Sequence, residues 1–66
     1  MDIKDILKQL RKENGLSQKD IATAIGIART TYSNYEQGLR QPDLTTVTKL
    51  CALFDVSADE LLGIES

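Results

Sequence analysis

Signals that start and stop helices follow one another closely along this sequence, and they limit the fold more than any other feature does. Ser17, Asp43 and Ser57 favour helix N-termini, because their side chains accept hydrogen bonds from free backbone N–H groups. Glycine favours helix C-termini, and the apolar stripes are followed by Gly15, Gly26, Gly38 and Gly63. No segment shows the alternation typical of a half-buried strand. The sequence therefore predicts an all-α fold of five short helices.

Apolar residues recur within these segments at helical spacing, and they define the expected core. The core positions are Ile3, Ile6, Leu7 and Leu10 in the first helix; Ala22, Ile25 and Ile27 around the second; Tyr32 and Tyr35 in the third; and Leu44, Val47, Leu50, Cys51 and Phe54 in the fourth. A chain of 66 residues is short, and a chain of this size buries only about 60% of the surface of its unfolded form. We therefore expect one domain, residues 1–66, with a small core and no deep catalytic cleft.

The connection between the second and third expected helices, residues 17–24 and 28–37, is very short. Only Ile25, Gly26 and Ile27 separate them. So short a link makes two helices cross steeply, and Gly26 can adopt a turn conformation that a residue with a Cβ resists. The spacing predicts a helix-turn-helix unit over residues 17–36. The second helix of such a unit stands out from the body and can enter a DNA major groove.

Several sequence features coincide with those of one family. Ser-Gln opens the second helix, Ile-Ala lies within it, Gly marks the turn, Tyr-x-x-Tyr-Glu-x-Gly closes the third helix, and Val-Ser-x-x-x-Leu-Leu spans residues 56–62 near the end. The stretch LSQKDIATAIGIARTTYSNYEQGLRQPDL, residues 16–44, resembles the helix-turn-helix family of phage repressors and Cro-type (XRE-like) transcriptional regulators. The similarity continues through TKLCALFDVSADELL. It implies a compact five-helix, lambda-repressor-like DNA-binding domain that binds operator DNA as a dimer.

The resemblance implies two sets of DNA contacts. It places base contacts on the exposed side of the third helix, at Ala28, Arg29, Thr30, Ser33 and Asn34. Arginine pairs with guanine, asparagine with adenine, and methyl groups suit thymine. It places phosphate contacts at Arg11, Gln18, Lys19, Gln37 and Arg40. For Gln18, a local role in capping the second helix is a serious alternative.

The resemblance also implies an ion pair between Arg11 and Glu36 that orients Arg11 towards a phosphate. We expect an exposed pair, which contributes only about 0–1 kcal/mol to stability. Ala28 departs from the family pattern, because many relatives have a capping Ser or Thr there. The missing cap costs about 1 kcal/mol.

Charge is unevenly distributed along the chain. The net charge of −2 does not favour nucleic-acid binding. Residues 1–42, however, hold seven Lys or Arg against five acids, whereas residues 43–66 hold only Lys49 against five acids. We therefore expect the first part to face DNA and the acidic part to face away.

These observations predict a sequence-specific transcriptional regulator of double-stranded DNA, acting as a homodimeric repressor on a near-palindromic operator. Leu39, Leu62 and Ile64 are apolar residues left over from the core, and we expect them at the dimer interface. The sequence has no histidine and a single cysteine, so we expect no enzyme activity, metal site, cofactor or small-molecule ligand. We also expect no membrane segment and a cytoplasmic location.

Two alternatives remain open at this point. The same fold can serve as a protein-interaction module, such as an antitoxin or a bridging factor. Substitutions at the apolar residues would then matter more than substitutions at Arg29. Alternatively, the chain is the N-terminal DNA-binding part of a longer repressor with its own oligomerisation or sensing domain.

Overall fold

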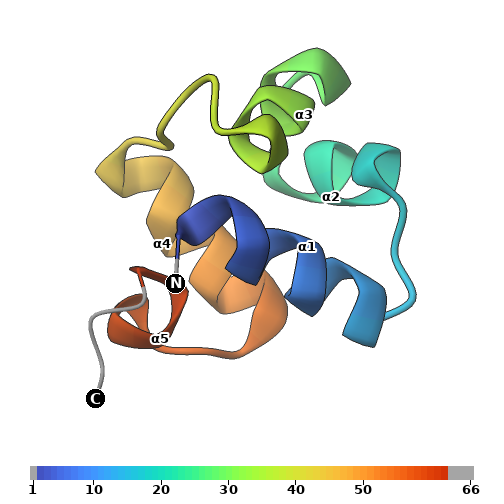
Figure 1. The fold of residues 1–66 in the computed structure, drawn as a ribbon. Helices are drawn as coiled ribbons and strands as arrows, with labels where there is room; N and C mark the ends of the chain where they lie inside the picture. Colours follow the sequence, from blue (N-terminus) through green and yellow to red (C-terminus); the bar gives the residue numbers. More distant parts are fainter. Residues whose placement is uncertain (1, 63–66) are drawn as a thin grey trace.

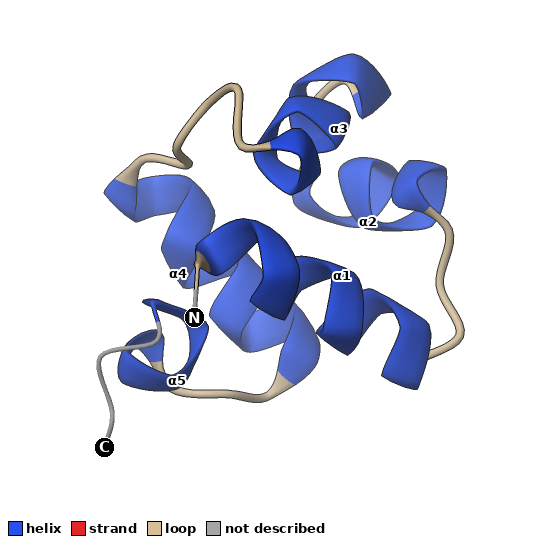
Figure 2. Ribbon diagram, in the orientation of Figure 1, coloured by secondary structure: helices blue, strands red, loops and turns tan. Residues whose placement is uncertain are grey.

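The computed structural model describes residues 2–62, and helices dominate this range (Figure 1). The helices are α1 (Ile3–Glu13), α2 (Gln18–Ile25), α3 (Arg29–Gln37), α4 (Leu44–Phe54) and α5 (Ala58–Leu62). Figure 2 shows no strand among the described residues. The prediction of an all-α, five-helix fold is confirmed.

Most of the expected helix ends form as the sequence indicates. At the start of α2 the backbone N–H of Asp20 donates to Ser17 Oγ, and the backbone N–H of Ser17 donates back to Asp20 Oδ2, both at 3.0 Å. Asp43 caps α4 by accepting from the backbone N–H of Thr46 at 2.8 Å. Gly26 ends α2 in the left-handed region with φ 76°. The expected stop at Gly63 lies outside the described residues.

The core brings together one face of every helix. Its fully covered side chains are Leu7, Ile21, Tyr32, Leu50 and Leu61. Tyr32 and Tyr35 are both buried, as predicted, and their rings meet edge to face with centroids 6.3 Å apart. Helix α3, which carries both rings, packs against α1 and α2. The buried tyrosines therefore fix which side of α3 faces outwards.

Leu44 is a correction to the expected core. We expected it on the inner face of α4, but its side chain is 81% exposed. The buried side of α4 is centred on Leu50, and at about 100° per residue Leu44 lies about 120° away around the helix. Thr46 and Phe54 each lie about 40° from Leu50 by the same rotation, and both are buried. A threonine thus takes the core position that we assigned to a leucine.

Helix α3 lies at the edge of the molecule. It packs on α1 and α2, and Figure 1 shows no other helix on its outer side within the described chain. The loop from Gly38 to Asp43 then leads away from α3 to the start of α4. The fold therefore presents the outer face of α3, together with the N-terminus of α2 and this loop, on one accessible part of the surface.

Candidate nucleic-acid interface

The outer face of α3 carries the side chains that the sequence analysis assigned to base contacts. Ala28, Arg29 and Thr30 are exposed at the N-terminal end of the helix. Ser33 and Asn34, one turn further on, are half-buried and less accessible than expected. The most accessible hydrogen-bonding groups of this set are therefore those of Arg29 and Thr30.

Ser33 and Gln37 form a pair within α3. The amide Nε2 of Gln37 donates to Ser33 Oγ at 2.8 Å, between positions one helical turn apart. The bond leaves the Ser33 hydroxyl proton and the Gln37 carbonyl oxygen available, since a hydroxyl can donate while it accepts. Both side chains are thus held in place on the helix surface.

Ala28 is the N-cap of α3, and it makes no side-chain capping bond. Its backbone has φ −69° and ψ 145°, the extended conformation that N-cap residues adopt. The free backbone N–H groups of the first turn therefore have no acceptor from Ala28. They remain available to solvent or to an anion at this exposed end of the helix.

A hydrogen-bonded network ties α3 to α1 and α2. Arg11 Nε lies 2.7 Å from Glu36 Oε2, and Arg11 Nη2 lies 3.2 Å from Glu36 Oε1. Arg11 Nη1 also donates to the backbone carbonyl of Leu16 at 3.3 Å. Gln18 Nε2, from the first turn of α2, donates to Glu36 Oε1 at 3.2 Å. One carboxylate thus joins three helices behind the exposed face.

The ion pair differs from our expectation in its burial. We expected an exposed pair, but the Glu36 side chain is 2% exposed and the Arg11 side chain 20% exposed. The cause is the packing of α1 against α3, which covers the carboxylate. A buried charge is strongly unfavourable without partners, so the network is a structural requirement of this fold.

The electrostatics of the network follow from this burial. Burial alone would raise the pKa of Glu36, but hydrogen bonds, first of all from Arg11, outweigh it and the pKa lies below its ordinary value. Burial, and then the adjacent Glu36 carboxylate, raises the pKa of Tyr32 far above its ordinary value. The Tyr32 hydroxyl forms no hydrogen bond with any described residue, and its polar neighbour is this carboxylate. The Glu36 carboxylate therefore stays ionised at neutral pH.

The network also explains how Gln18 is oriented. Its amide nitrogen donates to Glu36 of α3, and the capping bonds at the start of α2 are those of Ser17 and Asp20. This bond could not be predicted from the sequence, because residues 18 and 36 are brought together only by the packing of α2 against α3. Gln18 and Arg11 therefore meet at the same Glu36 carboxylate, beside the start of α2.

The remaining candidates occupy the two ends of this surface. Lys19 is exposed in the first turn of α2. Gln37 and Arg40 are exposed at the other end, where α3 gives way to the loop. The backbone N–H groups of Leu39 and Arg40 both donate to the carbonyl of Asn34, at 2.9 and 3.3 Å. These bonds keep Arg40 close to the C-terminal end of α3.

The expected dimer residues are only partly described. Leu39 is 70% exposed. The side chain of Leu62 and the whole of Ile64 lie outside the described part of the structure. Leu44 joins Leu39 as an exposed large apolar residue on the other side of the loop.

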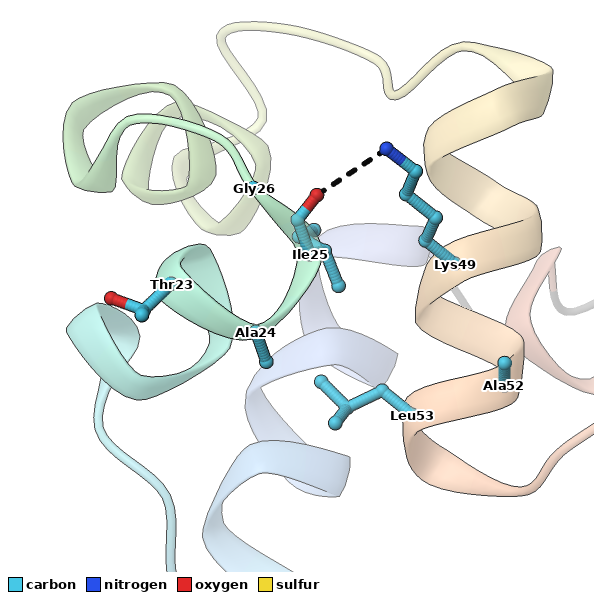
Figure 3. A pocket seen from close by; sticks show the side chains of 7 residues that line it. All are labelled: Thr23, Ala24, Ile25, Gly26, Lys49, Ala52 and Leu53. Atoms are coloured by element: carbon cyan, nitrogen blue, oxygen red, sulfur yellow. Dashed lines mark hydrogen bonds between the residues drawn. The ribbon is translucent and has the colours of Figure 1, made fainter.

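A surface hollow of about 600 Å³ lies between the end of α2 and α4. It is lined by Thr23, Ala24, Ile25, Gly26, Lys49, Ala52 and Leu53. Lys49 Nζ donates to the backbone carbonyl of Ile25 at 3.5 Å, which links α4 to the end of α2 (Figure 3). Lys49 is the one ionisable side chain among these lining residues.

The described residues were also considered as a possible metal site or membrane segment, and they form neither. They contain no group of three or more His, Cys, Asp or Glu placed to hold a metal ion. No helix among them has the length and apolar character needed to cross a membrane.

The contact of α2 with α3 across a left-handed Gly26, with an exposed polar face on α3, defines a helix-turn-helix domain. Comparison with known proteins supports the same class of domain. The family profile described as "Helix-turn-helix" matches residues 7–61. The chain belongs to this family, whose characterised members include transcriptional regulators and phage repressors.

Two relatives illustrate the similarity. The HTH-type transcriptional regulator AnsR of Bacillus subtilis is 46% identical over 61 residues, which cover 92% of this chain and 53% of AnsR. The phage CTXphi transcriptional repressor RstR of Vibrio cholerae is 39% identical over 57 residues, 86% of this chain and 51% of RstR. The chain thus spans about half the length of these relatives.

Solved structures show the same fold. A transcriptional regulator from Listeria innocua superposes with a TM-score of 0.91 at 31% identity, over 98% of this chain and 61% of that one. The biofilm regulator SinR, in complex with DNA, superposes with a TM-score of 0.84 at 36% identity, over 91% of this chain and 97% of that one.

Proposed function

We propose that this chain binds double-stranded DNA in a sequence-specific manner and represses transcription by occupying a promoter. The observation that carries the proposal is the exposed face of α3, where Arg29 and Thr30 stand clear of the core while Tyr32 and Tyr35 are buried behind them. An exposed helix of this kind fits a major groove, where such side chains distinguish base pairs. In this proposal the chain acts by binding alone, in the cytoplasm, without catalysis.

The proposed contacts divide into two classes. Ala28, Arg29, Thr30, Ser33 and Asn34 meet base edges, with Arg29 pairing bidentately with a guanine. Arg11, Gln18, Lys19, Gln37 and Arg40 meet phosphates and set the register of the helix in the groove. The buried Glu36 supports this division, because it holds Arg11 and Gln18 together at one end of the surface.

We further propose that the chain binds as a homodimer. Two copies of α3 would enter successive major grooves about 34 Å apart on a near-palindromic site. The exposed Leu39 is available for the contact, with Leu62 and Ile64 as its proposed neighbours. Sedimentation of the chain with and without the selected duplex measures the number of copies bound. A single copy per site would refute the dimer.

Selection of binding sites from random duplex DNA tests the main proposal. The wild-type chain should enrich a defined sequence at low salt. The Arg29→Ala variant should lose preference at one base position per half-site, at a cost of about 1–3 kcal/mol. The Arg40→Ala variant is the matched control, because loss of a phosphate contact weakens binding to all sequences alike.

The outcomes separate this proposal from a protein-interaction role on the same fold. A wild-type chain that enriches no sequence would refute DNA recognition. If substitution of Leu39 then abolishes function in cells while Arg29→Ala leaves it intact, the interaction role is favoured.

A further inference from the structure

The C-terminal end of α3 is unfavourable for a nearby phosphate on electrostatic grounds. All residues of α3 are described, and its last turn contains no basic residue. The C-terminus of a helix carries a partial negative charge, equivalent to about half an elementary charge. A phosphate that approaches Gln37 and Arg40 would meet this negative end.

Lys4, from the first turn of α1, lies over this end of the helix. A Cβ atom placed on Gly38 would be 3.1 Å from Lys4 Cδ, 3.9 Å from Cε and 3.8 Å from Nζ. The lysine stem therefore crosses Gly38 directly, and the ammonium group ends beside the C-cap of α3. Gly38 is left-handed with φ 77° and has no side chain to keep Lys4 away.

The backbone also keeps Arg40 at this end of α3. The N–H groups of Leu39 and Arg40 bond back to the carbonyl of Asn34, so the chain stays folded against the helix end after Gly38. Arg40 is exposed at this point, two residues beyond the glycine that Lys4 covers. The backbone of Arg40 and the side chain of Lys4, which come from different elements, thus lie at the same end of α3.

We propose that Lys4 is a further DNA-binding residue. From α1 of the same chain, it supplies the positive charge that the end of α3 lacks. It makes the approach of the phosphate backbone to Gln37 and Arg40 favourable, and it contributes one counterion-releasing contact per bound chain. The inference rests on the proposed DNA binding and extends its phosphate-contacting surface from α2 and α3 to the start of α1.

The test measures binding of the chain to its selected duplex over a series of salt concentrations. Removal of one phosphate contact lowers the slope of log K against log salt by about 0.9 per bound chain, which near 0.1 M salt corresponds to about eightfold weaker binding. We expect this change for Lys4→Met, without a change in sequence preference. Lys4→Arg, which keeps the charge, should restore the slope.

Lys12→Met is the matched control, because Lys12 is exposed at the other end of the same helix. It should leave the slope unchanged. A Lys4→Met variant whose slope equals that of the wild type would overturn the inference, even if its binding were weaker for reasons of stability. A failure of Lys4→Arg to restore the slope would overturn it as well.

The same measurement keeps the two proposals apart. If the wild-type chain itself binds no duplex with a steep salt dependence, the proposed function fails. If the wild type binds steeply and Lys4→Met does so equally, only the role of Lys4 fails.

Discussion

Removal of the Arg11 guanidinium is the sharpest perturbation that this structure offers. The Arg11→Met variant keeps most of the aliphatic stem but loses two hydrogen bonds to Glu36 and one to the carbonyl of Leu16. The Glu36 carboxylate then remains buried, with Gln18 as its one remaining donor among the bonds described above. We expect a large loss of stability, because an uncompensated charge is left inside the protein.

The size of the loss can be bounded. Removal of one partner of a buried pair costs about 3–5 kcal/mol. Glu36 can escape part of this cost by binding a proton. At pH 7 that step costs at most about 3.7 kcal/mol, taking an ordinary glutamate pKa of about 4.3 and about 1.36 kcal/mol per pKa unit. Because Arg11 is 20% exposed, the pair is not completely buried. We therefore take the lower end of the range and expect Arg11→Met to lose about 3 kcal/mol of unfolding free energy.

The loss should depend on pH with a definite sign. In the wild type the folded pKa of Glu36 is lowered, so its contribution is present above the ordinary pKa and is lost as the pH falls through the folded value. In Arg11→Met, burial raises the folded pKa, so the variant gains relative stability on acidification. The difference between the two proteins should therefore shrink from about 3 kcal/mol at about pH 7 to about 1 kcal/mol near about pH 4.5.

Urea and thermal unfolding followed by circular dichroism measure this difference. A change of about 1 kcal/mol shifts the midpoint by about 4–8 °C in a domain of this size. Since such domains have only about 3–5 kcal/mol of stability, an osmolyte such as TMAO keeps the variant folded at the start of the transition. Arg29→Met removes an exposed arginine instead and should change stability by less than about 0.5 kcal/mol.

A second variant tests the asymmetry of the pair. Glu36→Gln leaves Arg11 able to turn towards water, so it should cost less than Arg11→Met. Its cost should change little between about pH 7 and about pH 4.5, because this range lies above the lowered pKa of Glu36. The double variant should lose less than the sum of the two single losses, because the buried charge is gone. A cost for Arg11→Met below about 1 kcal/mol at pH 7, or one that is equal at both pH values, would refute this reasoning.

The remaining predictions concern helix ends. Ala28→Ser should stabilise the fold by about 1 kcal/mol, because the backbone already has N-cap geometry; an unchanged unfolding midpoint would contradict this. Gly26→Ala and Gly15→Ala should each cost about 1–2 kcal/mol through left-handed strain, since no atom lies within 4 Å of either added Cβ; a much larger urea-measured loss would mean a clash. Ser17→Ala should raise the pKa of Asp20 part of the way to its ordinary value, because the Ser17 backbone N–H, the largest cause of the lowered pKa, remains. In both proteins the bond that Asp20 accepts is lost as the pH falls through the lowered pKa of Asp20. NMR titration of the Asp20 carboxyl group measures this pKa in the wild type and in the variant.

The sequence by itself determined the helices and their ends. Ser17, Asp43, Gly26 and Gly38 act on neighbouring backbone groups, so their effects are local and could be predicted without the fold. Tyr32 was assigned correctly to the core on helical spacing alone, together with Tyr35. Local rules sufficed there because the period of a helix sets which side chains share a face.

Tertiary structure decided what covers each helix. The spacing of α4 allowed Leu44 as a core residue, yet α4 turns Thr46 inwards and leaves Leu44 exposed. The burial of Glu36, its bond to Gln18 and the placement of Lys4 over Gly38 all join residues far apart in the chain. Their physical cause is the packing of α1 and α2 against α3, because burial and charge pairing depend on which surfaces meet and not on the residue types of one segment.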